Sequence, residues 1–461
     1  MVFSSNLFLF AFLPLFLASY YLVPIRFRSA LILVFSYGFY AWWRPDFLGL
    51  LVGVSLVSYS FALAIDAAVL PARRYRLLCV GVGLNLLALA YFKYANFGLD
   101  TLNVLLQDMG LEPVNFVRIL LPIGLSFYIF HAISYMVDIY RREAAPANNL
   151  IDFAAFIALF PHLVAGPVLR YKLLAEQFRH REHSWARFGQ GCVLFMVGFC
   201  KKVLVADSVA PLADAAFLAT QSSLADAWLG TLAYTVQLFF DFSGYTDMAI
   251  GLALMIGFTF PQNFDDPYTA RSITEFWKRW HMSLSSWLRE YLYIALGGNR
   301  HGSLRTYLNL FLTMLLGGLW HGANWTFVLW GAWHGGILAA ERYWRQRHPQ
   351  ALLPSWLAVA WTMLLVMLGW VLFRAPDVAS AMRMFQALFG LSSWPLSDAM
   401  AWEATPDRVL VLVAGLLLVY AMPWLRRHQG GMLRWALIPL FLWALAKLSA
   451  QSFTPFLYFQ F

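Results

Sequence analysis

The stretch from Phe276 to Trp325 decides how this chain folds, because it opens with FWKRWH (276–281) and closes with GGLWHGANW (317–325). Each motif places one histidine among tryptophans, and the chain around them is largely apolar. A histidine in apolar surroundings must find a hydrogen-bond partner or lose its charge. The two motifs therefore mark either packed structure or a chemical site.

The composition of the whole chain predicts a membrane protein. Of its 461 residues, 61% are hydrophobic and only 12% are charged, and the mean hydropathy is +0.62. A soluble domain carries roughly 25% charged residues. A deficit of that size over the full length excludes a globular core with a water-facing surface. We therefore expect an all-α, polytopic membrane protein.

Apolar runs recur along the chain, and a spanning helix needs about 20 mainly apolar residues. The expected spans are 6–24, 29–43, 46–68, 77–92, 114–137, 150–168, 225–256, 306–320, 323–341, 354–373, 408–425 and 432–450. Pro161, Gly166 and Pro167 interrupt one of them, and non-helical backbone at membrane depth is tolerated where protein or water covers it. We expect about 10–12 transmembrane helices plus re-entrant or interfacial helices. They should form a single domain over 1–461, with its core near 120–340.

The net charge of +9 lies in short loops between the expected spans. Basic residues gather near 26–28, 73–76, 141–142, 170–187, 271–305, 342–347 and 426–427, whereas the connections around 93–112 and 203–224 carry almost none. By the positive-inside rule, the basic loops face the cytoplasm and the N-terminus lies outside. Topology explains this charge better than nucleic-acid binding does. The first apolar run lacks a basic n-region, so it is expected to be a retained helix.

The most polar block is 257–305. Its Ser-Ile-Thr-Glu sequence from Ser272 to Glu275 is a capping box that predicts the start of a helix. Apolar and aromatic residues then follow at three- and four-residue spacing, which predicts one amphipathic face at the membrane interface or inside the bundle. These residues are Trp277, Trp280, His281, Leu284 and Leu288. The glycines of 297–301 predict a basic turn.

His321 is the strongest candidate for chemistry. Gly318 and Gly322 flank it and allow close approach of backbone or ligand. A neutral imidazole there can take a proton from an acceptor hydroxyl, and ionisable residues within a membrane are functional by default. A second Trp-His-Gly sequence follows thirteen residues later, around His334. On a continuous helix that spacing gives about 20 Å of rise and roughly 220° of rotation, so the two imidazoles would not share a site.

Other polar residues have more than one reading each. His281 either orients His321, binds substrate, or lies at the interface. His131 and His162 are expected to be structural or pore-lining. Asp241 is either a hydrogen-bonded structural carboxylate or a group that tunes a basic partner or lines a cavity.

No metal site is expected, because the sequence has no His-Glu-x-x-His motif and no cysteine cluster. Cys79, Cys192 and Cys200 lie in apolar runs and are expected to be packing residues. A serine-hydrolase elbow and a P-loop are also missing from the sequence. Direct transfer with a histidine base is then simpler than a covalent intermediate.

Further residues are candidates for contacting the substrate or the donor. This set is Trp277, Arg279, Trp320, Asn324, Asp241, Asn263 and Arg300. Basic residues at 170, 201, 202, 279 and 300 would suit the phosphates of a nucleotide-bearing donor that enters from inside. Positive-inside topology accounts for each of these charges equally well.

The chain resembles the membrane-bound O-acyltransferase (MBOAT) family, in its bacterial AlgI-like branch of alginate O-acetylation proteins. The resemblance runs from MVFSSN at the start, through LPIGLSFY (121–128), FDFSGYTDMAIG (240–251) and PQNF (261–264), to FLYFQF (456–461). Its most specific parts are FW…H (276–281), GGNR (297–300) and GGLWHG (317–322).

The resemblance implies a ring of helices around a tunnel in the bacterial inner membrane. It implies that His321 is the catalytic histidine and His281 a second active-site residue. The donor would be cytoplasmic acetyl-CoA, with no permanently bound cofactor, and the acetyl group would pass toward a periplasmic acceptor. Periplasmic acetyltransferases of the AlgJ, AlgX and AlgF type would be partners that finish the transfer to the polysaccharide.

Alginate is the polymer that the resemblance favours, while related proteins acetylate cellulose or peptidoglycan. The related DltB proteins take D-alanine from a carrier-protein thioester, so a carrier-borne donor is an alternative to acetyl-CoA. Two hypotheses from other classes stay open at this point. One is a polysaccharide or acetyl transporter without transferase activity, although no paired repeat halves of the transporter kind are visible. The other is a structural scaffold for a periplasmic acetylation complex.

Overall fold

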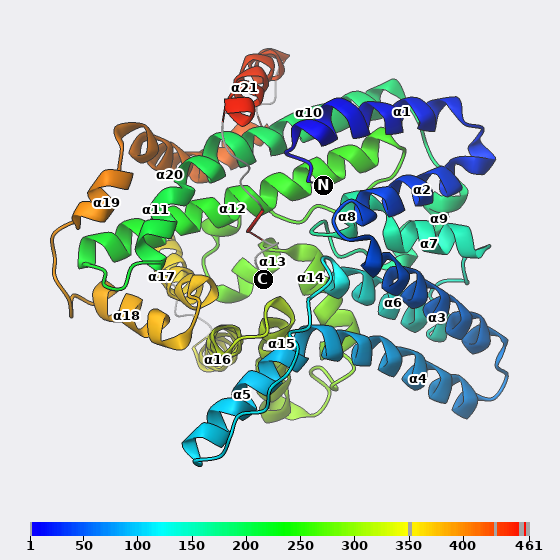
Figure 1. Ribbon diagram of the computed structural model, residues 1–461, viewed down its shortest axis with the longest axis horizontal. Helices are drawn as coiled ribbons and strands as arrows, with labels where there is room; N and C mark the ends of the chain where they lie inside the picture. Colours follow the sequence, from blue (N-terminus) through cyan, green and yellow to red (C-terminus); the bar gives the residue numbers. More distant parts are fainter. Residues whose placement is uncertain (1, 349–352, 428–430, 451–455, 458–461) are drawn as a thin grey trace. The chain divides into compact units, whose positions relative to one another are not determined.

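A computed structural model describes residues 2–348, 353–427, 431–450 and 456–457 (Figure 1). Over these residues the chain forms helices and loops and no strand, so the expected all-α fold is confirmed. The chain divides into two compact units, residues 1–192 with 249–261 and residues 193–248 with 262–461. The single membrane domain expected from the sequence stays a prediction.

The first unit is built from the apolar runs of the N-terminal half. Its helices are α1 (Leu13–Leu22), α2 (Arg28–Ala41), α3 (Leu48–Ala67), α4 (Pro71–Leu89), α5 (Ala95–Asp108), α6 (Leu125–Tyr140), α7 (Leu150–Ala158), α8 (Phe160–Leu163) and α9 (Tyr171–Arg179). Two π-helical turns, η1 (Phe8–Phe12) and η4 (Ala90–Tyr94), continue into α1 and α5. The next helix, α10 (Trp185–Cys200), contributes residues to both units.

The second unit carries both histidine motifs. Its helices are α11 (Asp207–Phe217), α13 (Ile273–Arg279), α14 (Met282–Trp287), α15 (Gly302–His321), α16 (Trp325–Arg347), α17 (Ser355–Arg374), α18 (Val378–Leu388), α19 (Asp398–Glu403), α20 (Pro406–Arg427) and α21 (Gly431–Ala450). The long helix α12 (Leu224–Met255) has most of its length in this unit. Short 3₁₀ and π turns, among them η5 (Lys201–Ala206), η6 (Pro267–Thr269) and η7 (Leu288–Tyr293), link these helices.

Four helical runs among the described residues are long and apolar enough to cross a membrane: 45–67, 71–108, 355–374 and 406–424. Phe8–Leu22 and Trp435–Ala450 are shorter apolar helices. Two predicted connections contain helix, since 93–112 is helical as far as Asp108 and 203–224 as far as Phe217. A scarcity of basic residues indicates which side of the membrane a segment faces, but it does not show where a helix ends. The number of crossings stays a prediction.

The interruption expected around Pro161 is real, and polar residues of α6 support it. After α8 the chain runs without regular structure from Val164 to Arg170, and most of this stretch is buried. Its backbone N–H groups find acceptors on one face of α6. Leu169 N–H donates to His131 Nε2 (3.1 Å), Tyr171 N–H to the Ser134 hydroxyl (3.3 Å) and Lys172 N–H to Asp138 (3.2 Å). A structural role for His131 is therefore confirmed.

His162 also serves the backbone of this interruption. Its Nε2 lies 2.9 Å from the carbonyl oxygen of Phe156, to which it donates. The three cysteines are free thiols, and Cys79 is exposed, so the expectation that all three are packing residues is wrong for Cys79.

Glycines let α15 and α16 pack backbone to backbone. A methyl group on Gly331 would lie 2.6 Å from the carbonyl oxygen of Met314, and one on Gly318 would lie 2.3 Å from the carbonyl oxygen of Phe327. Real Cβ atoms do not approach carbonyl oxygens so closely, so these positions fix how the two helices meet. The two motif histidines of this region, His321 and His334, lie on these two helices.

Gly331→Ala is expected to destabilise the second unit by about 1–3 kcal/mol, the usual effect of overpacking a rigid contact. Gly336→Ala on the same helix is the matched control, because a methyl group there has nothing within 4 Å. The control should unfold at the same temperature as the parent or slightly higher, since alanine favours helix over glycine. Thermal unfolding of both variants in one detergent measures the difference. Equal unfolding temperatures would contradict the packing argument.

Candidate active site

The helix start predicted at Ser272 is confirmed, and Ser272 caps α13. The Ser272 hydroxyl accepts from Glu275 N–H (3.1 Å), and the Glu275 carboxylate accepts from Arg271 N–H (2.8 Å). Glu341 of α16 accepts from Ile273 and Thr274 N–H (2.9 and 3.3 Å). These bonds satisfy the free N–H groups of the first turn. They also fix α13 against α16, which follows His321 in the chain.

The continuous amphipathic helix predicted from Trp277 to Leu288 is wrong, because the chain breaks at His281. Helix α13 ends at Arg279, and α14 begins at Met282. Between them His281 has a left-handed backbone, with φ of 44°. Asn263 stabilises this break, since its carbonyl oxygen accepts from Met282 N–H (2.9 Å) and its side-chain oxygen from Ser283 N–H (3.1 Å). A partner more than fifteen residues away replaces the helical bonds that the spacing predicted.

The same Asn263 oxygen orients the His281 ring. Because this oxygen accepts from Ser283 N–H and from the Ser283 hydroxyl (2.8 Å), the bond of 3.1 Å to His281 Nδ1 requires a proton on Nδ1. The lone pair of the neutral ring is then on Nε2. His281 lies outside the expected spans, and burial lowers its pKa to about 3. It is therefore a neutral imidazole held in one tautomer.

Asn263→Asp is expected to raise the pKa of His281, because a carboxylate beside Nδ1–H favours the charged imidazolium. An opposite charge at this distance moves a pKa by about 1–3 units. If the neutral ring takes part in the reaction, the acid limb of the pH–rate profile should move to higher pH by a similar number of pH units. Ser283→Ala is the control, since it removes a hydrogen bond without adding charge. A profile that is unchanged in Asn263→Asp would contradict a role for neutral His281.

His321 is the last residue of α15, and the helix is not continuous beyond it. Asn324 caps the new helix α16, with its side-chain oxygen accepting from Thr326 N–H (3.0 Å). The premise that His321 and His334 lie on one helix is therefore wrong. Both imidazoles instead contact the indole of Trp330, with ring centroids 5.2 and 5.0 Å away.

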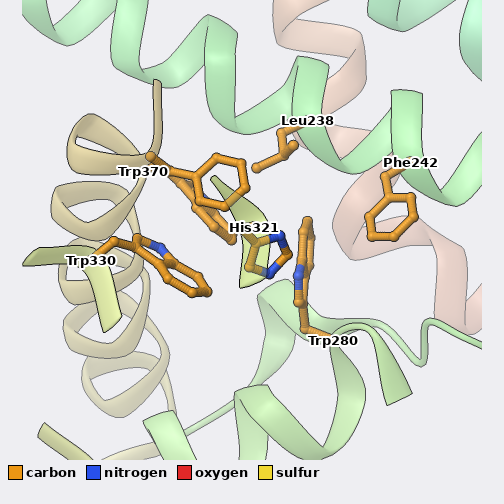
Figure 2. A pocket seen from close by; sticks show the side chains of 7 residues that line it. Leu238, Phe242, Trp280, His321, Trp330 and Trp370 are labelled. Atoms are coloured by element: carbon orange, nitrogen blue, oxygen red, sulfur yellow. The ribbon is translucent and has the colours of Figure 1, made fainter. Parts of the chain in front are cut away.

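His321 lines a small pocket with an aromatic wall (Figure 2). Its imidazole lies between the indoles of Trp330 and Trp280 in this view. The other lining residues come from α12 and α17: Leu238, Phe242, Trp370 and Phe373. The empty space among these side chains is about 220 Å³, with space open to solvent included. It suits a small transferred group beside His321 better than a whole substrate.

His281 is connected to this pocket through the wall. Its ring packs edge-on against Phe242, with centroids 4.7 Å apart, and Phe242 lines the pocket. Trp320 lies beside both histidines, with ring centroids 6.4 Å from His281 and 4.9 Å from His321. The structure thus brings the two predicted histidines to one aromatic cluster.

His334 lies behind the pocket wall and is not among its lining residues. Its Nδ1 accepts from the indole N–H of Trp277 (3.4 Å), whose ring also packs on Trp330 (5.5 Å). An indole N–H is a donor only, so the proton of neutral His334 is on Nε2. Trp277 therefore supports the wall and contacts His334, and does not line the pocket.

The remaining candidates lie elsewhere. Arg279 pairs with Glu275 (2.5 Å) and donates to Thr269 (2.9 Å), while exposed Arg300 donates to backbone carbonyls of its own turn. Asn324 has the capping role given above. Lys201 pairs with Asp247 (2.6 Å).

Asp241 and Lys202 form a buried ion pair. They do not form a binding site for a nucleotide-bearing donor. Lys202 Nζ lies 2.7 Å from Asp241 and 2.6 Å from Asp207, and all three side chains are nearly inaccessible. Asp241 also accepts from Leu457 N–H (3.0 Å). Lys202 as a phosphate contact is therefore wrong, and the structural reading of Asp241 is the one that these contacts support.

The sequence did not single out Trp330, Trp370 and Phe373 as site residues, although they contact His321 or line its pocket. They lie in predicted spans where an aromatic residue facing a cavity resembles one facing lipid. The repeated Trp-His-Gly sequence around His334 was the one available signal that this part of α16 lies close to His321. Among the described residues no group of three or more metal-ligating side chains is present.

Comparison with known proteins identifies the family of this chain. The family model of the membrane-bound O-acyltransferases matches residues 141–379, which include both histidine motifs. The chain is 52% identical to a probable alginate O-acetylase AlgI of Azotobacter vinelandii and 49% identical to one of Pseudomonas aeruginosa, in each case over the full length of both chains. It is 35% identical to a peptidoglycan O-acetyltransferase of Helicobacter pylori, over 85% of this chain and 80% of that one. The chain therefore belongs to the membrane-bound O-acyltransferase family, and it is a membrane acyltransferase.

Proposed function

We propose that the protein passes an acetyl group from cytoplasmic acetyl-CoA across the inner membrane for O-acetylation of an exopolysaccharide, and that this polymer is alginate. The observation that carries the proposal is the position of His321 in an aromatic pocket too small for a whole substrate. Full-length identity of about one half to proteins named alginate O-acetylase supports the choice of polymer over peptidoglycan, whose related enzyme is 35% identical.

The proposed chemistry needs one base and no covalent enzyme intermediate. His321 takes the proton of an acceptor hydroxyl as its oxygen bonds to the thioester carbonyl carbon. The carbon–sulfur bond then breaks, the CoA thiolate leaves, and the proton from His321 neutralises it. The products are the acetyl ester and CoA. The apolar wall around the pocket excludes water, which would otherwise hydrolyse the thioester.

The charge distribution supports a donor on the cytoplasmic side. Arg342, Arg345 and Arg347 lie at the end of α16 remote from His321, next to the basic turn 297–301 in the expected topology. We place the N-terminus in the periplasm by the same rule. Periplasmic acetyltransferases of the AlgJ, AlgX and AlgF type are the proposed partners that complete transfer to the polymer.

Acetyl-CoA turnover by the purified protein in nanodiscs tests this proposal. Release of the CoA thiol is followed with a thiol reagent, and transfer of labelled acetyl is followed with added acceptor. The protein should consume acetyl-CoA and not free acetate. If the protein consumes a carrier-protein thioester but does not consume acetyl-CoA, acetyl-CoA is not the donor. If cells from which the gene is deleted export the polymer in the usual amount but without acetyl groups, the protein is not a transporter of that polymer.

A further inference from the structure

The indole N–H of Trp330 is a buried hydrogen-bond donor that the folded chain does not use. Trp330 lies on α16 and is 1% exposed. Its Nε1 is buried and has no hydrogen-bond partner among the described residues. Buried indole N–H groups usually find a partner, and a buried donor that is left unpaired is unfavourable by about 1–3 kcal/mol. A phenylalanine at this position would fill an aromatic wall without that cost.

The side chains around the His321 pocket, which Trp330 lines, supply no hydrogen-bond acceptor for this donor. Apart from the two residues just named, the pocket is lined by Leu238, Phe242, Trp280, Trp370 and Phe373. These side chains are hydrocarbon or carry an indole N–H, which is itself a donor. The His321 ring packs edge-on to the Trp330 ring, with centroids 5.2 Å apart, and makes no hydrogen bond with Nε1. A molecule that enters the pocket can supply the missing acceptor.

The Trp330 ring is held in place before any ligand arrives. The next residue is Gly331, where α16 lies so close to α15 that a methyl group would be 2.6 Å from the Met314 carbonyl oxygen. The indole stacks on Trp370, with ring planes 16° apart and centroids 6.3 Å apart, and Trp277 packs edge-on against it. In Figure 2 the nitrogen lies on the edge of the Trp330 ring nearer to Trp370 in this view. A donor fixed in this way needs no reorganisation during a reaction.

The carbonyl oxygen of an acetyl thioester is the hydrogen-bond acceptor that this donor suits. When His321 takes the proton of the acceptor hydroxyl, the hydroxyl oxygen bonds to the carbonyl carbon and the C=O electron pair moves onto the carbonyl oxygen. The pair returns as the carbon–sulfur bond breaks and the thiolate leaves. Negative charge therefore develops on this oxygen in a pocket with apolar walls, where a fixed donor stabilises it far more than water-exposed donors do.

We infer that the Trp330 indole N–H binds the carbonyl oxygen of the acetyl thioester and stabilises the oxyanion that forms there. Trp330 is then a catalytic residue with a role distinct from that of His321, which acts as the base. This inference rests on the proposed function and adds to it the group that polarises the carbonyl. It also accounts for a tryptophan at position 330, since only the indole combines an aromatic wall with an N–H donor.

Two replacements at position 330 separate the N–H group from the shape of the ring. Benzothienylalanine keeps a bicyclic aromatic ring and lacks the N–H, whereas Trp330→Phe removes the N–H and also leaves space. Each should lower kcat with acetyl-CoA by about 10²–10³-fold, the usual effect of removing one oxyanion donor. KM for acetyl-CoA should change little, because the charge develops in the transition state.

Trp333→Phe is the matched control on the same helix. The Trp333 indole N–H donates to the Leu365 carbonyl oxygen (3.0 Å), and Trp333 does not line the pocket. The control should keep a kcat close to that of the parent, although the loss of a hydrogen bond lowers its stability. Thermal unfolding in detergent shows that each variant is folded before its kinetics are compared.

An infrared measurement reports on the proposed hydrogen bond itself. Acetyl-CoA labelled with ¹³C at the carbonyl carbon is bound to the His321→Ala protein, in which turnover is slow, and its spectrum is subtracted from that of the unlabelled complex. A donor on the carbonyl oxygen weakens the C=O bond. The carbonyl band should therefore lie at lower wavenumber than in His321→Ala protein that carries benzothienylalanine at position 330. Adding Trp333→Phe instead should leave the band in place.

Several outcomes would overturn the inference. One is a normal kcat with benzothienylalanine at position 330, because a loss in Trp330→Phe would then reflect ring volume. Another is a carbonyl band at the same wavenumber with and without the N–H. If neither variant folds, the wild-type protein is tested with S-acetonyl-CoA and S-propyl-CoA, which differ by a carbonyl oxygen. The ketone should bind more tightly, and equal affinities would overturn the inference. A folded wild-type protein that does not consume acetyl-CoA would instead remove the proposed function itself.

Discussion

His321→Ala is expected to lower the rate of acyl transfer by about 10²–10⁴-fold, the range that a positioned general base contributes. His321 is the titratable side chain among the residues that line the pocket. Trp330 and Phe373 pack edge-on against its ring and hold it in place. The alanine variant keeps these neighbours and loses the group that accepts the proton. The effect should therefore fall on kcat, and KM for acetyl-CoA should change little.

His334→Ala is the matched control for this experiment. His334 is buried, contacts the same indole as His321, and does not line the pocket. Its loss should lower stability and reduce turnover by about tenfold or less, as expected for a residue that supports the wall. Thiol release in nanodiscs and thermal unfolding are measured on both variants. Normal turnover by His321→Ala would rule out the mechanism, and equal losses in the two variants would contradict His321 as the single base.

Local signals in the sequence predicted elements well where the stabilising partner is also local. Ser272 caps the start of α13 as expected, and the proline-interrupted run around Pro161 is broken as expected. The break at His281 was not predicted, because Asn263 supplies its hydrogen bonds from eighteen residues away. Spacing alone cannot show that such a partner competes with the helix.

The same limit applies to the site. The sequence singled out His321 and Trp320 as candidates, since a histidine among glycines and tryptophans is unusual in an apolar run. It did not identify Trp370 or Phe373, whose relevance depends on α17 packing beside His321. It also offered Lys202 as a phosphate contact, because its two acidic partners are five and thirty-nine residues away. Pairing between distant buried residues is decided by packing, which one sequence does not display.

Lys202→Met is expected to destabilise the second unit by about 3–5 kcal/mol, the usual effect of removing one partner from a buried ion pair. Lys202 is 2% exposed and is the cation between Asp207 and Asp241. Its Nζ also lies 4.8 Å from the ring centre of Phe456, next to the Leu457 N–H that Asp241 accepts. Methionine fills a similar volume but leaves two carboxylates facing each other without a charge between them. The unfolding temperature in detergent should fall accordingly.

Two further variants show whether the charge or the packing is responsible. Lys201→Met removes the neighbouring lysine, whose pair with Asp247 is more accessible, and should cost about 1 kcal/mol or less. Adding Asp241→Asn to Lys202→Met relieves the repulsion between the two carboxylates. The unfolding temperature of the double variant should therefore be higher than that of Lys202→Met alone. If the double variant is no more stable than Lys202→Met alone, packing and not charge is what Lys202 contributes. A Lys202→Met protein as stable as the parent would show that the buried triad does not hold α12 and η5 together.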